Sequence, residues 1–451
     1  MASAHGERDV KLWKCKVYYF LVIGGNACLL PFLPLFYQEW GLKHWQIGLL
    51  GASRATCGSV LNPLWGAFAD ATRKHNAIHF FALAWQAFWY ANLRTLAPRA
   101  WPWTYAYVLL TESCACCTGA LADSAVGLMC RRYNIANNRT DANYGRQRLW
   151  GAIAWGCVFA PSVGLAMALG SEKTRQILPF ASFGVLFGAG ALMSLWLEHD
   201  VVPESHAPKA METHRELASD DGDDDDDDET APISTRLWRV VTKPANAIQF
   251  ALFTFMGASM YITDVYLNLW LQDNGGKTDT MGVALAVTSV TEITVFYYQA
   301  QIKAKFGINW LLLLTPFAYA VRQAWYAMLP SFSSPWWVLP AQTLHGLTFA
   351  LYWSTGNDMV QSIAPRGLTT AMTGLFSGAN NVGGLLGSII GGVVYDELGG
   401  RALFAGVSLI NFTLGFALVA AKLREDQPRR PPAYVRLSTG VPVVELELRD
   451  L

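Results

Sequence analysis

The chain has 451 residues, of which 52% are hydrophobic, 13% aromatic and only 15% charged, and its formal net charge is +0. This composition is too apolar for an ordinary soluble protein of the same length. A soluble protein with a large buried core is therefore the weaker interpretation, and an integral membrane protein is the stronger one.

Twelve apolar stretches, each long enough to cross a bilayer as a helix, cover most of the chain. A bilayer core of about 30 Å needs roughly 20 apolar residues in helical conformation. The stretches are 17–37, 46–68, 78–96, 105–129, 149–170, 177–197, 248–271, 281–301, 310–329, 337–359, 371–395 and 403–423. The sequence therefore predicts an all-α, polytopic membrane protein with twelve transmembrane helices in two six-helix bundles.

A long hydrophilic insert divides the stretches six and six. The predicted parts are a tail 1–16, a first bundle 17–197, a linker 198–243, a second bundle 244–423 and a tail 424–451. The linker contains an acidic run between Asp220 and Glu229. Such a run repels itself and cannot fold alone, so we expect a disordered linker. A divalent-cation sensor or a partner-binding segment is the alternative.

The positions of lysine and arginine predict the orientation, because positive residues are retained on the cytoplasmic side. With the N-terminus inside, most basic residues near the stretch ends fall on the inner side. The predicted outer loops hold only Lys43, Arg94, Arg99, Lys173, Arg175, Lys277 and Arg401. We therefore expect both termini and the linker to be cytoplasmic.

The cysteines do not indicate a metal site. All eight lie in the first half, and the cluster Cys114-Ala115-Cys116-Cys117 has no histidine or carboxylate pattern that would complete a tetrahedral site. Most of these thiols serve as small apolar groups inside predicted helices. We expect no metal and no cofactor.

Ionisable residues inside the predicted helices are the first candidates for function. A charge inside a bilayer is costly, so each one is a candidate for binding solute or protons. They are Arg54, Glu112, Asp123, Asp264, Glu292, Arg322, His345 and Asp358. For each of them, a structural ion pair between helices is the alternative.

Two further groups of polar residues point to a solute site. Arg148 and Trp155 are seven residues apart, so a continuous α-helix would place a guanidinium and an indole on one face, suited to an oxygen-rich, ring-shaped solute. The alternative is that Arg148 anchors the inner helix end by snorkelling. Asn380 and Asn381 interrupt an apolar, glycine-rich stretch and are expected to offer hydrogen bonds to a central cavity. Together with Asp123, these residues form the predicted substrate site.

A charged loop follows the second stretch. Gly66-Ala67-Phe68-Ala69-Asp70 precedes Arg73-Lys74. Asp70 can cap or pair with a neighbouring helix end while the basic residues stay at the inner surface. Gly66, Asp70 and Arg73 are therefore predicted to form a latch that breaks when the two halves rock, and an ordinary charged turn is the alternative.

This loop resembles a degenerate form of the loop between helices two and three of the major facilitator superfamily. Two further segments resemble the domain-6-type facilitators of animals, a branch related to lactose permease and to bacterial nucleoside and proton symporters. They are Tyr144-Gly145-Arg146-Gln147-Arg148-Leu149-Trp150-Gly151 with Trp155, and Thr343-Leu344-His345-Gly346. The resemblance covers essentially every predicted helix and fails in the linker and both tails.

The resemblance implies roles for several residues. In lactose permease, the arginine and tryptophan matching Arg148 and Trp155 hold the galactoside, and Arg322 and His345 fall roughly where it has a coupling arginine and histidine. In lactose permease a carboxylate from the fourth helix pairs with the arginine that matches Arg148. The corresponding stretch of the present chain, 126–130, is uncharged and offers no clear counterpart. Since the carboxylate expected after His345 is also replaced, Glu292 and Asp264 become the candidates for carrying protons.

The sequence thus predicts a secondary active or facilitative transporter that works by alternating access. Its expected cargo is a small polar solute of the sugar or nucleoside type, with protons as an optional second cargo. Its other expected partner is the lipid bilayer. We expect a monomer and no nucleic-acid partner. No catalytic dyad is recognisable, so we do not expect an enzyme. The alternative is a non-transporting receptor or scaffold that keeps the facilitator fold.

Overall fold

The structure is a computed structural model that describes residues 11–97, 100–137, 142, 144–199, 233–365 and 368–425. Most of the predicted N-terminal tail, the acidic run of the linker and almost all of the C-terminal tail lie outside these residues. Within the described parts of the chain, the regular elements are helices and there is no strand. The all-α prediction is confirmed.

The first bundle contains the first six predicted stretches. Its elements are α1 (Trp13–Leu29), η1 (Leu30–Phe32), α2 (Leu33–Glu39), α3 (His44–Thr72), α4 (His75–Ala91), α5 (Leu93–Leu96), α6 (Trp103–Ala115), α7 (Thr118–Ala136), α8 (Tyr144–Ala152), η2 (Ile153–Phe159), α9 (Ala160–Leu169) and α10 (Glu172–Ser194). Pro31 lies at the start of η1, where its missing N–H interrupts the helix between α1 and α2. α1 packs on α10 and α8, and α4 packs on α10 and α6.

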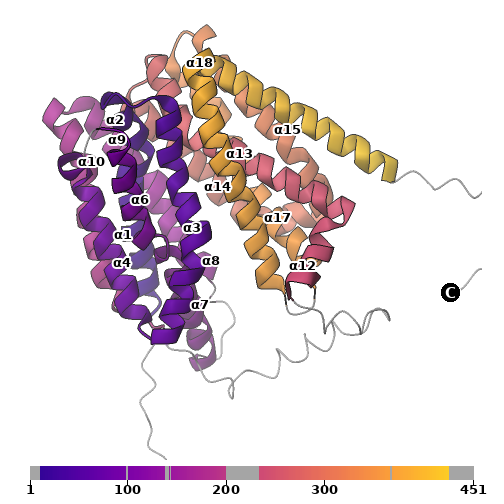
Figure 1. Cartoon of the computed structure of the whole chain (residues 1–451), viewed down its shortest axis with the longest axis horizontal. Coiled ribbons are helices and arrows are strands. Elements are labelled where there is room, and N and C mark those ends of the chain that lie inside the picture. Colours follow the sequence, from indigo (N-terminus) through magenta and orange to yellow (C-terminus); the bar gives the residue numbers. More distant parts are fainter. Residues whose placement is uncertain are drawn as a thin grey trace, which may run out of the picture.

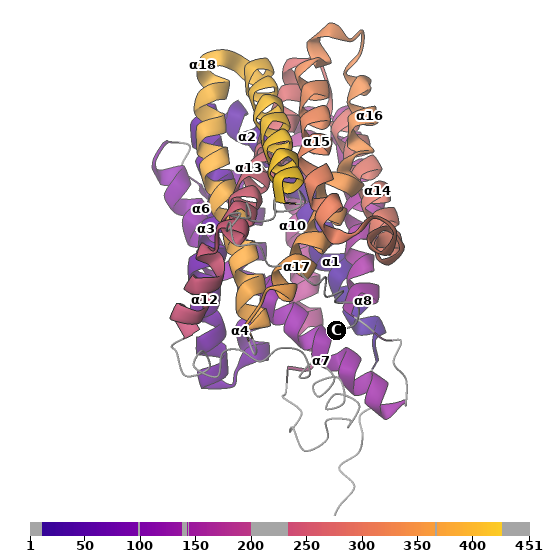
Figure 2. The same ribbon diagram turned by 90° about the vertical axis from the view of Figure 1, so that its right-hand side faces the viewer.

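The second bundle contains the other six stretches. Its elements are α12 (Ile233–Thr242), α13 (Pro244–Asp273), α14 (Thr278–Phe306), α15 (Ile308–Ala327), η5 (Leu329–Ser331), η6 (Pro335–Val338), α16 (Leu339–Gln342), η7 (Gly346–Leu351), α17 (Tyr352–Ser362) and α18 (Thr369–Glu425). α18 turns back at Gly399, whose φ of 82° is readily adopted by glycine, and Figure 2 shows this turn. α18 therefore supplies both of the last two predicted crossings.

The helices have the length and the outer surface of a membrane protein. Seven helical segments of the described chain are long and apolar enough to cross a membrane, and one of them, 371–420, has 50 residues. At 1.5 Å per residue that segment is about 75 Å long, enough for two crossings. Large apolar side chains such as Val185 and Leu409 are 71% and 67% exposed, as expected for a surface that faces lipid. The chain is a multi-pass integral membrane protein.

The two bundles meet at one end of the molecule and diverge toward the other (Figure 1). α3 packs on α18, and α9 packs on α14. At the end where α3 and α14 begin, which we name the closed end, the hydroxyl of Thr278 donates to the carbonyl of Gly164 at 2.9 Å. We name the opposite end the open end. There, Gly66 of α3 and Gly374 of α18 face empty space, because a Cβ built on either would meet nothing within 4 Å.

The apolar core follows the same division. One cluster of buried residues runs from the first bundle into the closed end of the second, so that Leu35 and Tyr266 belong to a single core. A separate cluster around Phe253 and Phe376 fills the second bundle on its own. The bundles are therefore joined by a shared core at the closed end, while the second bundle also holds a core that it does not share.

Candidate functional site

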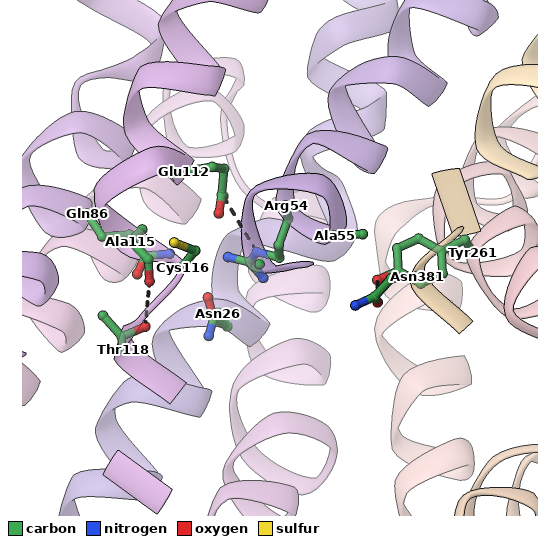
Figure 3. A pocket seen from close by; sticks show the side chains of 11 residues that line it. Asn26, Arg54, Ala55, Gln86, Glu112, Ala115, Cys116, Thr118, Tyr261 and Asn381 are labelled. Carbon is green, nitrogen blue, oxygen red and sulfur yellow. Dashed lines mark hydrogen bonds and ion pairs between the residues drawn. The ribbon is translucent and has the colours of Figure 1, made fainter. Parts of the chain in front are cut away.

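A polar cavity of about 300 Å³ lies between the bundles, and Figure 3 shows its lining. The lining residues are Asn26, Arg54, Ala55, Gly58, Gln86, Glu112, Ala115, Cys116, Thr118, Tyr261 and Asn381. Most of them come from α1, α3, α4, α6 and α7 of the first bundle, and the last two come from α13 and α18 of the second. Both bundles thus contribute side chains to one chamber.

An ion pair between a part-exposed arginine and a buried carboxylate forms one wall of this cavity. Arg54 Nε lies 3.5 Å from Glu112 Oε1, and the Tyr90 hydroxyl donates a hydrogen bond to the same carboxylate oxygen. The Glu112 side chain is 2% exposed, whereas that of Arg54 is 40% exposed. Arg54 is therefore the member of the pair that presents N–H donors to the cavity, and Glu112 holds it and compensates its charge.

The second bundle adds amide and hydroxyl groups. The Tyr261 hydroxyl donates to Asn381 Oδ1 at 3.2 Å, and Asn381 Nδ2 donates across the bundle interface to Ser59 Oγ at 3.0 Å. Asn381, predicted to face a central cavity, does line it. Its bond to Ser59 would have to break when the bundles move apart at this level.

Two buried acceptors beside the cavity have no hydrogen-bond partner among the described residues. Asn26 Oδ1 and Gln86 Oε1 are inaccessible to solvent and accept no hydrogen bond from the part of the chain that the structure describes. Buried polar atoms are nearly always paired in native proteins, and an unpaired one costs about 1–3 kcal/mol. Both amides line the cavity, so either oxygen could accept a donor from a bound molecule once its amide turns toward the cavity.

A second polar cluster of the first bundle surrounds Arg148. Arg148 Nη1 lies 3.2 Å from Asp123 Oδ2 and also donates to the Tyr144 hydroxyl, while the Tyr19 hydroxyl donates to Asp123 Oδ1 at 2.7 Å. The sequence suggested no carboxylate partner at 126–130, but α7 supplies one three residues earlier, at Asp123. Arg148 and Asp123 are 54% and 39% exposed, so the pair remains accessible.

Trp155 does not lie on a continuous α-helix with Arg148. It is half-buried within η2, a π-helical segment of residues 153–159. A π-helix has more residues per turn than an α-helix, so the seven-residue spacing does not by itself place the two side chains on one face. Such segments occur frequently at functional sites.

Arg322 lies at the centre of a polar cluster in the second bundle. Its side chain donates to the Tyr326 hydroxyl at 2.7 Å, to Gln342 Oε1 at 2.8 Å and to Thr348 Oγ1 at 3.0 Å, and Nη1 lies 3.1 Å from His345 Nδ1. Arg322 is only 3% exposed. The other ring nitrogen of His345 lies 3.7 Å from Glu292 Oε2. Three of the four predicted coupling residues are thus brought together.

The fourth, Asp264, lies on α13 within electrostatic range of both Arg322 and Glu292. Its side chain is exposed in the structure. Asn380 has a different environment: it is buried, accepts a hydrogen bond from the Tyr352 hydroxyl at 2.8 Å and donates to the Phe376 carbonyl. Its contacts are those of a residue that joins helices within the second bundle.

Replacement of Arg322 by alanine should lower the stability of the protein. The change removes three hydrogen bonds, to Tyr326, Gln342 and Thr348, at about 1 kcal/mol each, so we expect a loss of about 3 kcal/mol in the free energy of unfolding. Gln342 Oε1 keeps its bond from the Tyr326 hydroxyl. Thermal unfolding of the detergent-solubilised protein measures it. Arg401→Ala, which removes an exposed guanidinium, should change stability little, and an equal effect of both variants would contradict this account.

The predicted latch residues lie at the open end. Asp70 is 81% exposed and lies 2.9 Å from His75 Nε2, across the short turn between α3 and α4. Arg73 ends α3 with a positive φ of 54°. A Cβ built on Gly66 would meet no atom. Among the described residues, these three make no ion pair or hydrogen bond with the second bundle. The corresponding basic end of α14 forms a Lys303–Asp358 ion pair of 2.6 Å with α17.

These features define a class: two membrane-embedded helical bundles, joined at one end, with a polar cavity between them, are the architecture of a secondary transporter. The chain belongs to the MFS_1-like family, which its residues 12–405 match, and it is a membrane transporter of the major facilitator type. The predicted resemblance to this superfamily is confirmed.

Three relatives illustrate the match. The chain is 24% identical over 413 residues to the maltose permease of Geobacillus stearothermophilus, covering 90% of this chain and 94% of that protein. It is 34% identical over 167 residues to the major facilitator superfamily domain-containing protein 6-like of Danio rerio, covering 36% of this chain and 30% of that protein. Its fold is similar to that of the nucleoside transporter NupG, with a TM-score of 0.70, 16% identity and coverage of 91% and 98%.

Proposed function

We propose that this protein carries a small, uncharged polar solute, of the sugar or nucleoside type, across a membrane by alternating access. The observation that carries the proposal is the cavity between the bundles, whose only charged lining residues in the described chain, Arg54 and Glu112, compensate each other. A lining of this kind favours cargo with many hydroxyl or amide groups over ions. The likeness to a maltose permease supports a sugar as the first class to test.

The cavity provides matched donors and acceptors for such cargo. Arg54 offers donors, whereas the Thr118 hydroxyl donates to the Ala115 carbonyl at 2.9 Å and so can only accept. The side-chain amides of Asn26 and Gln86 also line the cavity. A solute that fills these positions satisfies groups that are otherwise desolvated without a partner, and this selects polyhydroxylated molecules over apolar ones of equal size. In this proposal, Arg148, Asp123 and Trp155 bind the solute at a second, more accessible position on its path.

We further propose that the open end faces the cytoplasm, because it carries the basic turns of both bundles, at Arg73 and at Lys303. If transport is proton-coupled, the acceptors are Asp264 and Glu292. Glu292 lies 3.7 Å from His345, and Asp264 lies within electrostatic range of Arg322. Protonation of either carboxylate would therefore weaken its attraction to the fixed positive charge of Arg322.

Uptake into proteoliposomes is the direct test. The purified protein is reconstituted and supplied with radiolabelled maltose, glucose or uridine, with and without an inward proton gradient. We expect saturable uptake of at least one of them above that of empty vesicles. A protein that binds none of them in thermal-shift measurements and moves none of them would instead support the receptor or scaffold interpretation.

Cys116 provides a test of the cavity itself. This thiol is half-buried and lines the cavity, so a charged methanethiosulfonate reagent should reach it and block uptake at least tenfold, and bound solute should protect it. Cys116→Ser should abolish this sensitivity. Cys157→Ser, which removes an exposed thiol on η2, should leave it unchanged. Inhibition that persists in Cys116→Ser would place the cargo elsewhere.

A further inference from the structure

α12 is a short helix that precedes the first crossing of the second bundle. The chain changes direction at Lys243, whose backbone is extended with ψ 130°, and α13 begins at Pro244. Both views place α12 at the open end of the molecule (Figures 1 and 2). The part of α13 that is apolar enough to cross a membrane begins at Asn246, so we expect α12 to lie near the depth of the lipid headgroups.

The two sides of α12 differ. Leu237 and Val240 pack against the core cluster of the second bundle, and Asn246 Nδ2 donates to the Val240 carbonyl at 2.8 Å, which holds α12 against the start of α13. Trp238, between them in sequence, is 70% exposed. A tryptophan exposed at this depth is typical of the membrane interface, where the indole has an apolar body and a polar N–H.

The charge of this segment has one sign. Residues 233–248 contain Arg236, Arg239 and Lys243 and no aspartate or glutamate. Arg239 on α12 and Lys243 at the turn before α13 are both exposed, and Arg239 directly follows Trp238. Long cationic side chains beside an interfacial tryptophan can extend to headgroup level while their apolar stems remain in contact with the helix.

We propose that α12 is a binding surface for anionic phospholipid, with Trp238 inserted beside the glycerol region and Arg239 and Lys243 bound to the headgroup phosphate or carboxylate. Basic amphipathic helices bind anionic bilayers through this combination of buried apolar area and charge. The bound lipid would hold α12 at the membrane and with it the point where the linker enters the second bundle. The proposal needs the membrane location of the protein but not its transport activity.

Lipid retention by the purified full-length protein tests this. Native mass spectrometry in detergent, with added phosphatidylserine or phosphatidylcholine, should show tighter binding of phosphatidylserine. We expect the double variant Arg239→Gln/Lys243→Gln to bind phosphatidylserine about thirtyfold more weakly, which corresponds to about 2 kcal/mol at about 1 kcal/mol per cation. Trp238→Ala should weaken the binding of both lipids.

Two controls make the result specific. Lys173→Gln/Lys277→Gln removes the same charge from exposed positions at the closed end and should retain phosphatidylserine. Arg239→Lys/Lys243→Arg keeps the charge and should retain it as well, which separates binding from folding. The proposal would be overturned if both glutamine double variants lost phosphatidylserine binding equally, or if the α12 variant bound phosphatidylserine as tightly as the unsubstituted protein. A protein that binds the lipid but moves no solute would refute only the proposed transport.

Discussion

Replacement of Arg54 by glutamine should reduce solute uptake in proteoliposomes by at least tenfold. The change removes the charged donors that face the cavity and leaves Glu112, which is 2% exposed, as a buried charge without its partner. Loss of a hydrogen bond to a charged group costs about 1.5–3 kcal/mol, or roughly 10-fold to 150-fold in binding. Thermal unfolding should show a lower stability for this variant, because an uncompensated buried charge is expensive.

Glu112→Gln should act differently on stability. Arg54 is 40% exposed and keeps its contact with water in the cavity, so its charge is less costly when unpaired. We therefore expect a smaller loss of stability from Glu112→Gln than from Arg54→Gln, with uptake reduced in both. The double variant should recover stability without recovering uptake. Uptake at the unsubstituted rate in both single variants would remove this pair from the solute site.

The fold could be predicted from the sequence because its signal is local. An apolar stretch of roughly 20 residues reports a membrane crossing without any knowledge of its neighbours. Interruptions of regular helix were not predictable in the same way. η2 and η7 are π-helical segments within otherwise ordinary crossings, and no residue pattern in 153–159 or 346–351 distinguishes them from α-helix. They depend on packing between helices.

The site was predictable in composition but not in pairing. Arg54 and Glu112 were recognised as costly charges within crossings, yet their meeting across α3 and α6 depends on how helices of the bundle rotate against one another. The family spacing points to the uncharged stretch 126–130 for the carboxylate partner of Arg148, whereas Asp123 lies one helical turn earlier on α7, and only the structure pairs it with Arg148. Asn380 and Asn381 are adjacent, and only the structure separates the one that packs between helices from the one that lines the cavity.

A second contact between the bundles at the closed end joins a carboxylate of α18 to the N-terminus of α3. Asp396 of α18 accepts the backbone N–H of His44 at 3.0 Å and of Trp45 at 3.1 Å, at the beginning of α3. The ring of His44 lies 2.7 Å from the same carboxylate and stacks on Tyr395 at 4.2 Å. A carboxylate at a helix N-terminus satisfies unpaired donors and interacts favourably with the helix dipole, so this contact holds the bundles together across their interface.

Glycine permits this contact. A Cβ built on Gly392 would lie 2.4 Å from the Cα of Trp45, a backbone atom that cannot rotate away. We therefore expect Gly392→Val to separate the bundles at the closed end. Overpacking typically costs about 1–3 kcal/mol, which shifts a two-state equilibrium about 5-fold to 150-fold. Asp396→Asn should shift it in the same direction but less, because the carbonyl oxygen can still accept one of the N–H groups.

Spin labels on both bundles measure the shift. Cysteines introduced at Lys43 and Lys277, exposed positions that begin α3 and α14, are labelled in a background whose native cysteines are replaced. Gly392→Val should lengthen the distance between the labels and lower uptake at least tenfold. Gly406→Val, on the same helix but with nothing within 4 Å of its Cβ position, should change neither. A protein whose closed end stays closed in Gly392→Val would show that the two bundles do not exchange contacts here, and alternating access would then require a different interface.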